Sequence, residues 1–214
     1  MRTLSIGLLA GLLGVTCKAG IITTDPGTGA TTIFTATGLT QGPGPVIVNG
    51  FSVAGTNVAV GDAPFGLGNN GAWIGFSFLS ANSKDTSITI NLGASYGLVG
   101  GFMNYSTPHD VTGTNPTIQA LAADGTTVLE TDILSAVAAI STPAGSNTGA
   151  FRGITRSQND IRFLRISGDF ILMHTLEVGQ APAAGVPEPG TFGLLLSGLS
   201  LVLLGRRQWA IRRS

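Results

Sequence analysis

The residue types that most often carry out catalysis are few and dispersed in this chain. Its two histidines, His109 and His174, lie 65 positions apart, and neither belongs to a metal-binding motif such as H-E-x-x-H. The segment 75–79 approaches the nucleophile motif G-x-S-x-G but lacks the final glycine. We therefore predict a protein without enzymatic activity. A surface hydrolase is the alternative, and it would need two carboxylates, or a serine and a histidine, to converge in a cleft.

Oxygen-bearing side chains near turns could converge on a calcium ion. The candidates share the carboxylate and amide oxygens that Ca²⁺ prefers: Asn104, Asp110, Asn159, Asp160 and Asp169. The chain has no D-x-[DN]-x-[DN]-G loop, however, and Asp and Asn are also ordinary turn residues. We predict no metal and no cofactor, with Ca²⁺ as the alternative.

Aromatic rings with polar neighbours could stack on the faces of sugars. Trp73, Tyr96 and Tyr105 are the candidates for glycan contact. In a strand over 73–79, Trp73 would lie opposite the apolar positions 74, 76 and 78, so we expect it to face outward. The alternative is that all three rings fill or border the core.

The charge balance of the middle of the chain excludes one class of partner. Residues 20–185 carry five basic and ten acidic side chains, a net charge of −5. A mildly acidic surface argues against nucleic acid, which requires a basic footprint. Four arginines could contact acidic polysaccharide, but we predict that they pair with the surplus carboxylates instead: Arg152, Arg156, Arg162 and Arg165.

The first 19 residues have the order of a secretory signal peptide. Arg2 precedes an apolar stretch at 4–15, and we predict cleavage between Ala19 and Gly20. The only cysteine, Cys17, would leave with this segment, so the mature chain would enter an oxidising compartment without a thiol. Cys17 could instead mark a lipoprotein, although Gly14 stands where lipid attachment favours leucine.

The C-terminal tail has the physical character of a membrane segment. Residues 191–205 are apolar or small and carry no charge. At about 1.5 Å per residue this run is short for a bilayer core of about 30 Å, but snorkelling arginine side chains extend the span. Pro187 and Pro189 cannot continue a helix, so we predict an extended, accessible stretch before it. A cytoplasmic C-terminus follows from the four arginines beyond the run: Arg206, Arg207, Arg212 and Arg213.

The order of Pro187-Glu188-Pro189, an apolar helix and a basic end resembles the PEP-CTERM sorting signal of exported bacterial proteins. The resemblance covers residues 187–214, with the transmembrane helix at 191–205. It implies recognition by an exosortase-type membrane protease in Gram-negative bacteria that make exopolysaccharide. A permanent C-terminal anchor without proteolysis is the alternative.

Short alternating runs between turn residues predict antiparallel strands. We expect strands at 31–37, 46–53, 73–79, 86–92, 96–105, 118–122, 127–131, 161–166 and 170–178, and one short helix at 132–140 capped by Asp132. Asp124-Gly125 predicts a type I′ hairpin, Gly168-Asp169 a type II′ hairpin, and Gly100-Gly101 a bulge. These elements predict an all-β fold, an antiparallel two-sheet sandwich of jelly-roll or galactose-binding-like type, between an N-terminal signal helix and a C-terminal transmembrane helix.

The segments together predict how the chain is organised and what it does. We expect a signal peptide at 1–19, a β-sandwich domain at 20–179, a linker at 180–186 and the sorting signal at 187–214. The chain would be exported, anchored at the inner membrane as a precursor, and then processed to the cell surface or the extracellular matrix. There the domain would be structural or adhesive, with exopolysaccharide as its glycan partner and the membrane and exosortase as its other partners.

Overall fold

Antiparallel strands account for nearly all the regular structure in the computed structural model, which describes residues 20–107 and 114–182. The predicted signal peptide with Ala19, His109, Asp110, the sorting motif, the membrane segment and its arginines all lie outside the described residues. Among the residues that are described, no helix is long and apolar enough to cross a membrane.

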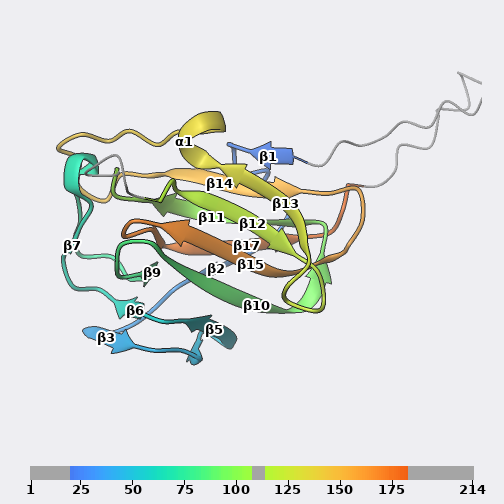
Figure 1. Ribbon diagram of the computed structural model, residues 1–214, viewed down its shortest axis with the longest axis horizontal. Coiled ribbons are helices and arrows are strands. Elements are labelled where there is room, and N and C mark those ends of the chain that lie inside the picture. The colour runs from blue at the N-terminus through green and yellow to red at the C-terminus, as the bar shows by residue number, and fades with distance from the viewer. Residues whose placement is uncertain (1–19, 108–113, 183–214) are drawn as a thin grey trace, which may run out of the picture. The chain divides into compact units, whose positions relative to one another are not determined.

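Two large sheets contain most of the strands. Sheet A has nine strands. Seven of them follow the order β1 (Gly20–Ile22), β14 (Ala150–Thr155), β11 (Leu98–Asn104), β16 (Leu172–Met173), β9 (Phe78–Ala81), β6 (Val58–Gly61) and β3 (Leu39–Gly42). The other two form a branch, in which β17 (Thr175–Gly179) pairs with β11 on one side and with β2 (Ala30–Ile33) on the other. Sheet B follows the order β13 (Val128–Ile133), β12 (Thr117–Leu121), β15 (Ile161–Gly168), β10 (Thr86–Tyr96), β5 (Phe51–Gly55) and β4 (Val46–Val48). In Figure 1, β1 lies at the top and β3 at the bottom.

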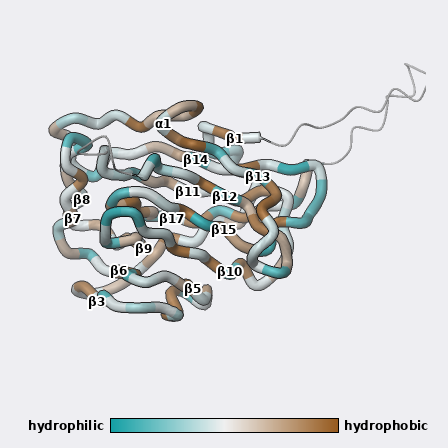
Figure 2. Tube along the Cα trace, in the orientation of Figure 1, coloured by the Kyte–Doolittle hydropathy of each residue, from teal (hydrophilic) through white to brown (hydrophobic). Residues whose placement is uncertain are grey.

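The two sheets enclose one apolar core. Alternate residues of β10 and β15 pair across sheet B, with Ile88 opposite Ile166 and Ile90 opposite Leu164. These four side chains join Val99 and others from sheet A in one buried cluster, and Figure 2 shows the apolar positions recurring along the strands. Burying each such side chain contributes about 1.5 to 3 kcal/mol. The prediction of an all-β, antiparallel fold is confirmed.

A second, smaller core covers the outer face of sheet A. Leu172 and Phe78 point away from the main core and pack against the short hairpin of β7 (Phe65–Gly66) and β8 (Ala72–Trp73). The Phe65 and Phe78 rings lie 4.9 Å apart between centroids. Between β7 and β8 the chain forms a 3₁₀ turn, η1 (Gly68–Asn70). This hairpin therefore covers one end of the outer face of sheet A.

The predicted strand at 73–79 is wrong, because the chain bends between β8 and β9. Gly75 adopts a φ of 77°, which breaks the alternation that would have placed Trp73 outward. Trp73 is 1 % exposed and fills the second core, whereas Ile74 and Phe76 are 47 % and 51 % exposed.

The predicted strand at 46–53 is two strands. Asn49 and Gly50 have φ values of 49° and 88°, and Val48 pairs with Phe51 across them. Positive φ at both central residues is the signature of a type I′ turn, and Asn-Gly is its preferred dipeptide. The segment is therefore a tight hairpin of β4 and β5.

The hairpin at Asp124-Gly125 forms between β12 and β13, but its turn is not type I′. Only Gly125 of the pair has a positive φ, at 70°, and its N–H donates to the Ala122 carbonyl at 3.0 Å. The Asp124 carboxylate accepts the N–H groups of Thr126 and Thr127 at 2.9 and 2.8 Å. A side-chain-capped loop thus replaces the expected two-residue turn.

The predicted hairpin at Gly168-Asp169 is wrong. Strand β15 already pairs with β10 on one edge and β12 on the other, so no edge is free for the strand that follows. The chain instead crosses to sheet A, where β16 pairs with β9 and β11. Gly168 and Phe170 adopt φ values of 140° and 49° at this crossing.

The bulge predicted at Gly100-Gly101 is wrong, because β11 pairs with β14 without a break through both glycines, and the irregularity lies on the opposite strand. Gly100 faces Glu177 and Met103 faces Met173, so the three residues 174–176 oppose only residues 101 and 102. A Cβ at Gly101 would come within 1.9 Å of the Thr175 carbonyl oxygen, so glycine permits the close approach.

The predicted helix at 132–140 is much shorter than expected. Strand β13 continues through Ile133, and α1 (Leu134–Val137) has four residues and no side-chain cap. Asp132 therefore lies in a strand and caps nothing. Strand β13 pairs with β12 as far as Ile133, which lies opposite Thr117. Residues 132 and 133 therefore belong to the strand and not to the helix.

Candidate functional site

Two of the three aromatic residues predicted to contact glycan are inaccessible. Trp73 and Tyr105 are 1 % and 2 % exposed, and the Tyr105 hydroxyl accepts the Ile140 N–H at 2.8 Å. Tyr96 is half-buried and packs against the main core. The structure thus rules out sugar stacking on Trp73 and Tyr105, because both rings fill the interior.

The described calcium candidates are engaged separately. Asn104 is fully buried, and its Oδ1 accepts the Tyr105 N–H at 2.8 Å and an N–H of Asn70 at 3.3 Å. Asp160 accepts both Arg156 nitrogens at 2.7 and 2.8 Å, and Asp169 accepts the Asp85 N–H at 3.0 Å. Asn159 bonds to Gln180 and Ala181. Within residues 20–107 and 114–182, no three His, Cys, Asp or Glu side chains gather.

The four arginines have different roles. Arg156 pairs with Asp160 and lies 3.9 Å from Glu130, as predicted, and the hydrogen bond to Asp160 raises the Arg156 pKa. Arg152 is 7 % exposed and donates to the carbonyls of Ala138 and Ala139, just after α1; burial lowers its pKa. Arg162 and Arg165 donate to neutral oxygens. Carboxylate pairing among the four is therefore confirmed only for Arg156.

Two pairs of side chains have the residue types that the hydrolase alternative requires. Ser77 and His174 are neighbours, but the His174 Nδ1 lies 2.6 Å from the Ser77 carbonyl oxygen, while the Ser77 hydroxyl donates to the Ala36 carbonyl at 3.2 Å. Nucleophile activation needs the ring nitrogen on the hydroxyl. Asp25 and Glu177 bring two carboxyl groups together, but Glu177 is 1 % exposed, so a polymer cannot reach its oxygens.

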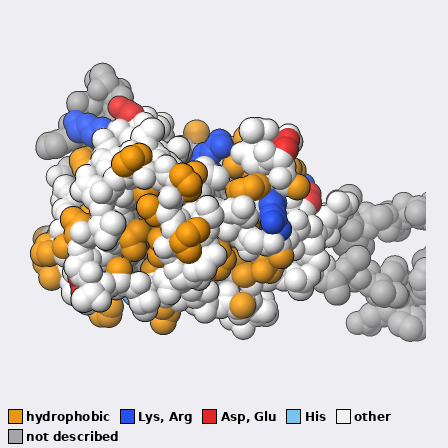
Figure 3. Space-filling view, turned by 90° about the horizontal axis from the view of Figure 1, so that it is seen from below, with side chains coloured by type: hydrophobic (Ala, Val, Ile, Leu, Met, Phe, Trp, Pro, Cys, Tyr) orange, Lys and Arg blue, Asp and Glu red, His pale blue; other side chains and the backbone are white. Residues whose placement is uncertain are grey.

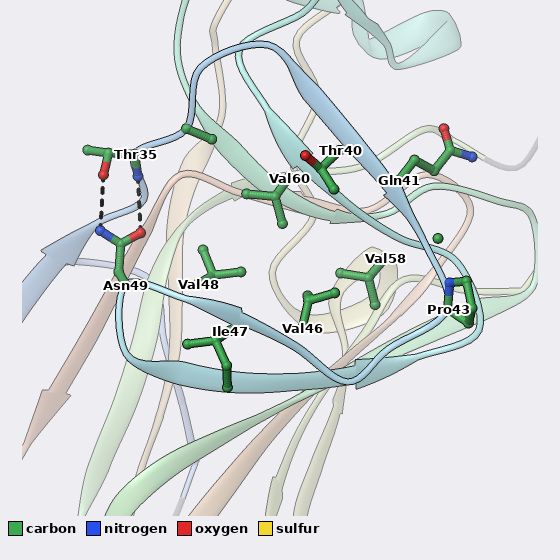
Figure 4. A pocket seen from close by; sticks show the side chains of 12 residues that line it. Thr35, Thr40, Gln41, Pro43, Val46, Ile47, Val48, Asn49, Val58 and Val60 are labelled. Carbon is green, nitrogen blue, oxygen red and sulfur yellow. Dashed lines mark hydrogen bonds between the residues drawn. The ribbon is translucent and has the colours of Figure 1, made fainter.

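A groove opens between the two sheets at one side of the sandwich. Strand β3 ends the order of sheet A and strand β4 ends that of sheet B, so two strand edges face each other across a cavity of about 500 Å³. Figure 4 shows Val46, Val48, Val58 and Val60 gathered around this space, while Gln41 points away from it. The lining residues come from β3, β4 and β6, from the β2–β3 and β3–β4 segments and from the β4–β5 turn: Thr35, Ala36, Thr40, Gln41, Gly42, Pro43, Val46, Ile47, Val48, Asn49, Val58 and Val60.

The groove has an aliphatic floor and a neutral polar rim. Val46 and Val60 are half-buried and Val58 is buried. On the rim, Asn49 Oδ1 accepts the Thr35 N–H at 3.2 Å and Asn49 Nδ2 donates to Thr35 Oγ1 at 3.1 Å. None of the lining residues is charged.

Apolar surface extends beyond the groove. Ile47 is 72 % exposed and Leu39, on β3, is 49 % exposed. Figure 3, which views the molecule from below the orientation of Figure 1, shows apolar side chains gathered on this face with few charged ones.

Comparisons of the chain with protein-family models, curated proteins and solved structures gave no match.

The groove was not predicted from the sequence, although a signal for it is present. One of its walls is β4 with the turn that follows it, which the Asn49-Gly50 dipeptide specifies. A neutral groove with an aliphatic floor and amide and hydroxyl groups at its rim can accept an uncharged, amphipathic ligand, since apolar faces pack on the valines while polar groups bond to the rim.

Proposed function

We propose that this chain is a non-enzymatic, exported protein of the cell surface or exopolysaccharide matrix. The observation that carries the proposal is the order of its segments. A secretory-type N-terminus precedes an all-β domain, and the Pro187-Glu188-Pro189 motif, apolar run and arginines follow it. In this proposal an exosortase-type protease recognises the tail in the inner membrane and releases the domain, which serves as a structural or adhesive module.

The groove between β3 and β4 is the surface we assign to glycan binding. Sugar rings present C–H faces and hydroxyl groups, which match the valine floor and the neutral rim. A neutral exopolysaccharide fits this lining better than an acidic one, because none of the residues that line the groove has a basic side chain. For the domain itself we propose a jelly-roll or galactose-binding-like arrangement, which the two antiparallel sheets around one core support.

The proposed processing is tested by the mature C-terminus. The full-length chain is expressed in a host with and without an exosortase gene, and surface material is analysed by mass spectrometry. We expect the host with the protease to yield a chain that ends near Pro187. An intact Arg212-Arg213-Ser214 end on surface material from that host would refute processing and support the permanent anchor.

The proposed glycan site is tested with a matched pair of lysine substitutions. Val46 is half-buried in the groove on β4, whereas Val128 is 45 % exposed on β13, at the opposite end of sheet B. We expect Val46→Lys to weaken binding to purified exopolysaccharide at least tenfold, with Val128→Lys unchanged. Equal binding by both variants would remove the groove from the proposal.

A further inference from the structure

The outer face of sheet A holds a buried carboxyl group that does not line the groove. Leu176 and Val178 lie in the main core, so Glu177, between them on β17, projects from the opposite face of the sheet. The pairing register places Glu177 beside Gly100, and Gly100 beside Gly153. These two glycines add no side chain of their own to that row, and the Phe151 ring and the Ile22 side chain lie against them.

The cover over Glu177 comes from the segment between β1 and β2. The Gly29 N–H donates to Glu177 Oε1 at 3.1 Å, and a Cβ at Gly29 would come within 2.7 Å of Glu177 Cγ and Oε1. Asp25, in the same segment, accepts the Gly27 N–H at 2.6 Å. Glu177 is consequently 1 % exposed beneath this segment.

The carboxyl pair lacks a compensating charge. Glu177 Oε2 accepts no hydrogen bond from an N–H or O–H donor among the described residues, and the polar group beside Glu177 is the Asp25 carboxyl. Burial and the neighbouring Asp25 raise the pKa of Glu177, while the interaction with Glu177 lowers the pKa of Asp25, and no basic side chain contributes to either effect. A buried acid next to a second acid is stable only if it binds a proton or a cation.

We propose that Asp25 and Glu177 bind a calcium ion, which joins the β1–β2 segment to strand β17. The two carboxylates supply up to four of the six to eight oxygens that Ca²⁺ takes, and backbone carbonyls and water can supply the rest without strict geometry. Mg²⁺ fits less well because it demands near-ideal octahedral geometry. None of the calcium candidates found in the sequence belongs to this site. The inference does not depend on the proposed function.

Ion binding would have a local consequence. The segment that carries Asp25 also lines a cavity of about 480 Å³ through Thr24, Pro26 and Thr28, and Gln180 and Pro182 form its other wall. Calcium would hold this segment against the strand after which the chain leaves the domain.

The test measures calcium binding to the purified full-length chain in mild detergent after treatment with chelating resin. Calorimetric titration with CaCl₂ should give one site with a Kd of about 0.1 to 1 mM, typical of extracellular modules. At a hundredfold excess over Kd, the melting temperature should rise by about 5 to 10 °C. MgCl₂ should give a smaller shift.

Conservative variants separate this site from others. Glu177→Gln and Asp25→Asn keep the size and polarity of each side chain, and each should lower the affinity for calcium at least tenfold. Asp124→Asn is the matched control, because Asp124 also accepts backbone N–H groups in a turn; it should bind calcium like the wild type. The absence of a calcium shift in the wild type, or an undiminished shift in both variants, would overturn the proposal. If the wild type shows no calcium shift and Glu177→Gln melts at a higher temperature than the wild type in chelator, the pair shares a proton instead of binding calcium.

Discussion

Replacing Asn70 by alanine should destabilise the protein strongly, because this side chain joins three segments at the end of strand β11. Asn70 is 2 % exposed. Its amide nitrogen lies 2.9 Å from the Tyr105 carbonyl oxygen, 3.1 Å from that of Ile140 and 3.3 Å from Asn104 Oδ1. Its Oδ1 accepts the Thr142 N–H at 3.1 Å.

The magnitude follows from the number of bonds lost. The amide has two N–H groups, so two donated bonds and one accepted bond are the most it makes at full strength. Each is worth about 1 kcal/mol net, and a buried carbonyl left without a partner costs about 1 kcal/mol more. We expect Asn70→Ala to lower the free energy of unfolding by about 3 to 4 kcal/mol, and the melting temperature by about 6 to 16 °C.

The neighbouring asparagine provides the control. Asn69 belongs to the same 3₁₀ turn but is exposed, so Asn69→Ala should change the free energy of unfolding by less than about 0.5 kcal/mol. Urea denaturation and scanning calorimetry of the full-length chain measure both variants. If Asn70→Ala loses no more than about 1 kcal/mol relative to Asn69→Ala, the network does not hold these segments and the reasoning fails.

Two further predictions concern the packing and the pH dependence of sheet A. Gly101→Ala should cost at least about 3 kcal/mol in urea denaturation, because its Cβ would come within 1.9 Å of the Thr175 backbone oxygen. Gly66→Ala, with nothing within 4 Å of the added Cβ, is the control, and equal losses would contradict the clash. The second prediction follows from the pKa of Glu177, which is raised above its ordinary 4.5 by burial and by Asp25. In chelator, Glu177 therefore stabilises the fold fully below about pH 4.5, and this contribution is lost as the pH rises through the raised pKa. Glu177→Gln should remove the part of the decline in melting temperature with rising pH that Glu177 causes. Asp132, whose pKa burial also raises, is present in both chains and should cause the same decline in each. An identical pH profile for the two chains would contradict the role of Glu177.

The sequence predicted strands best where apolar residues alternate strictly and the neighbours in space are regular. Residues 86–92 and 118–122 became β10 and β12, because their buried faces meet the same core. Residues 73–79 alternate equally well, yet the apolar positions 74 and 76 are exposed, since the bend at Gly75 turns the chain over a second core. A local pattern does not reveal that one sheet has both faces covered.

Strand pairing was the other limit of local reasoning. Gly168-Asp169 has good hairpin chemistry, but the edges of β15 are occupied by β10 and β12, which come from distant parts of the chain. For the same reason the sequence could not bring Asp25 to Glu177 or place β3 opposite β4. The turn at Asn49-Gly50, by contrast, has a local signal that the prediction of one strand over 46–53 missed, because an Asn-Gly dipeptide between apolar runs favours a tight turn.

The position of β17 determines how the domain would respond to a mechanical load. The chain leaves the described domain just after this strand, which is hydrogen-bonded to β11 on one side and to β2 on the other. A pull on the chain beyond Pro182 would therefore load two ladders, whereas β1, among the described residues, is bonded to β14 alone. Tension applied from the C-terminal side meets the more resistant of these two attachments.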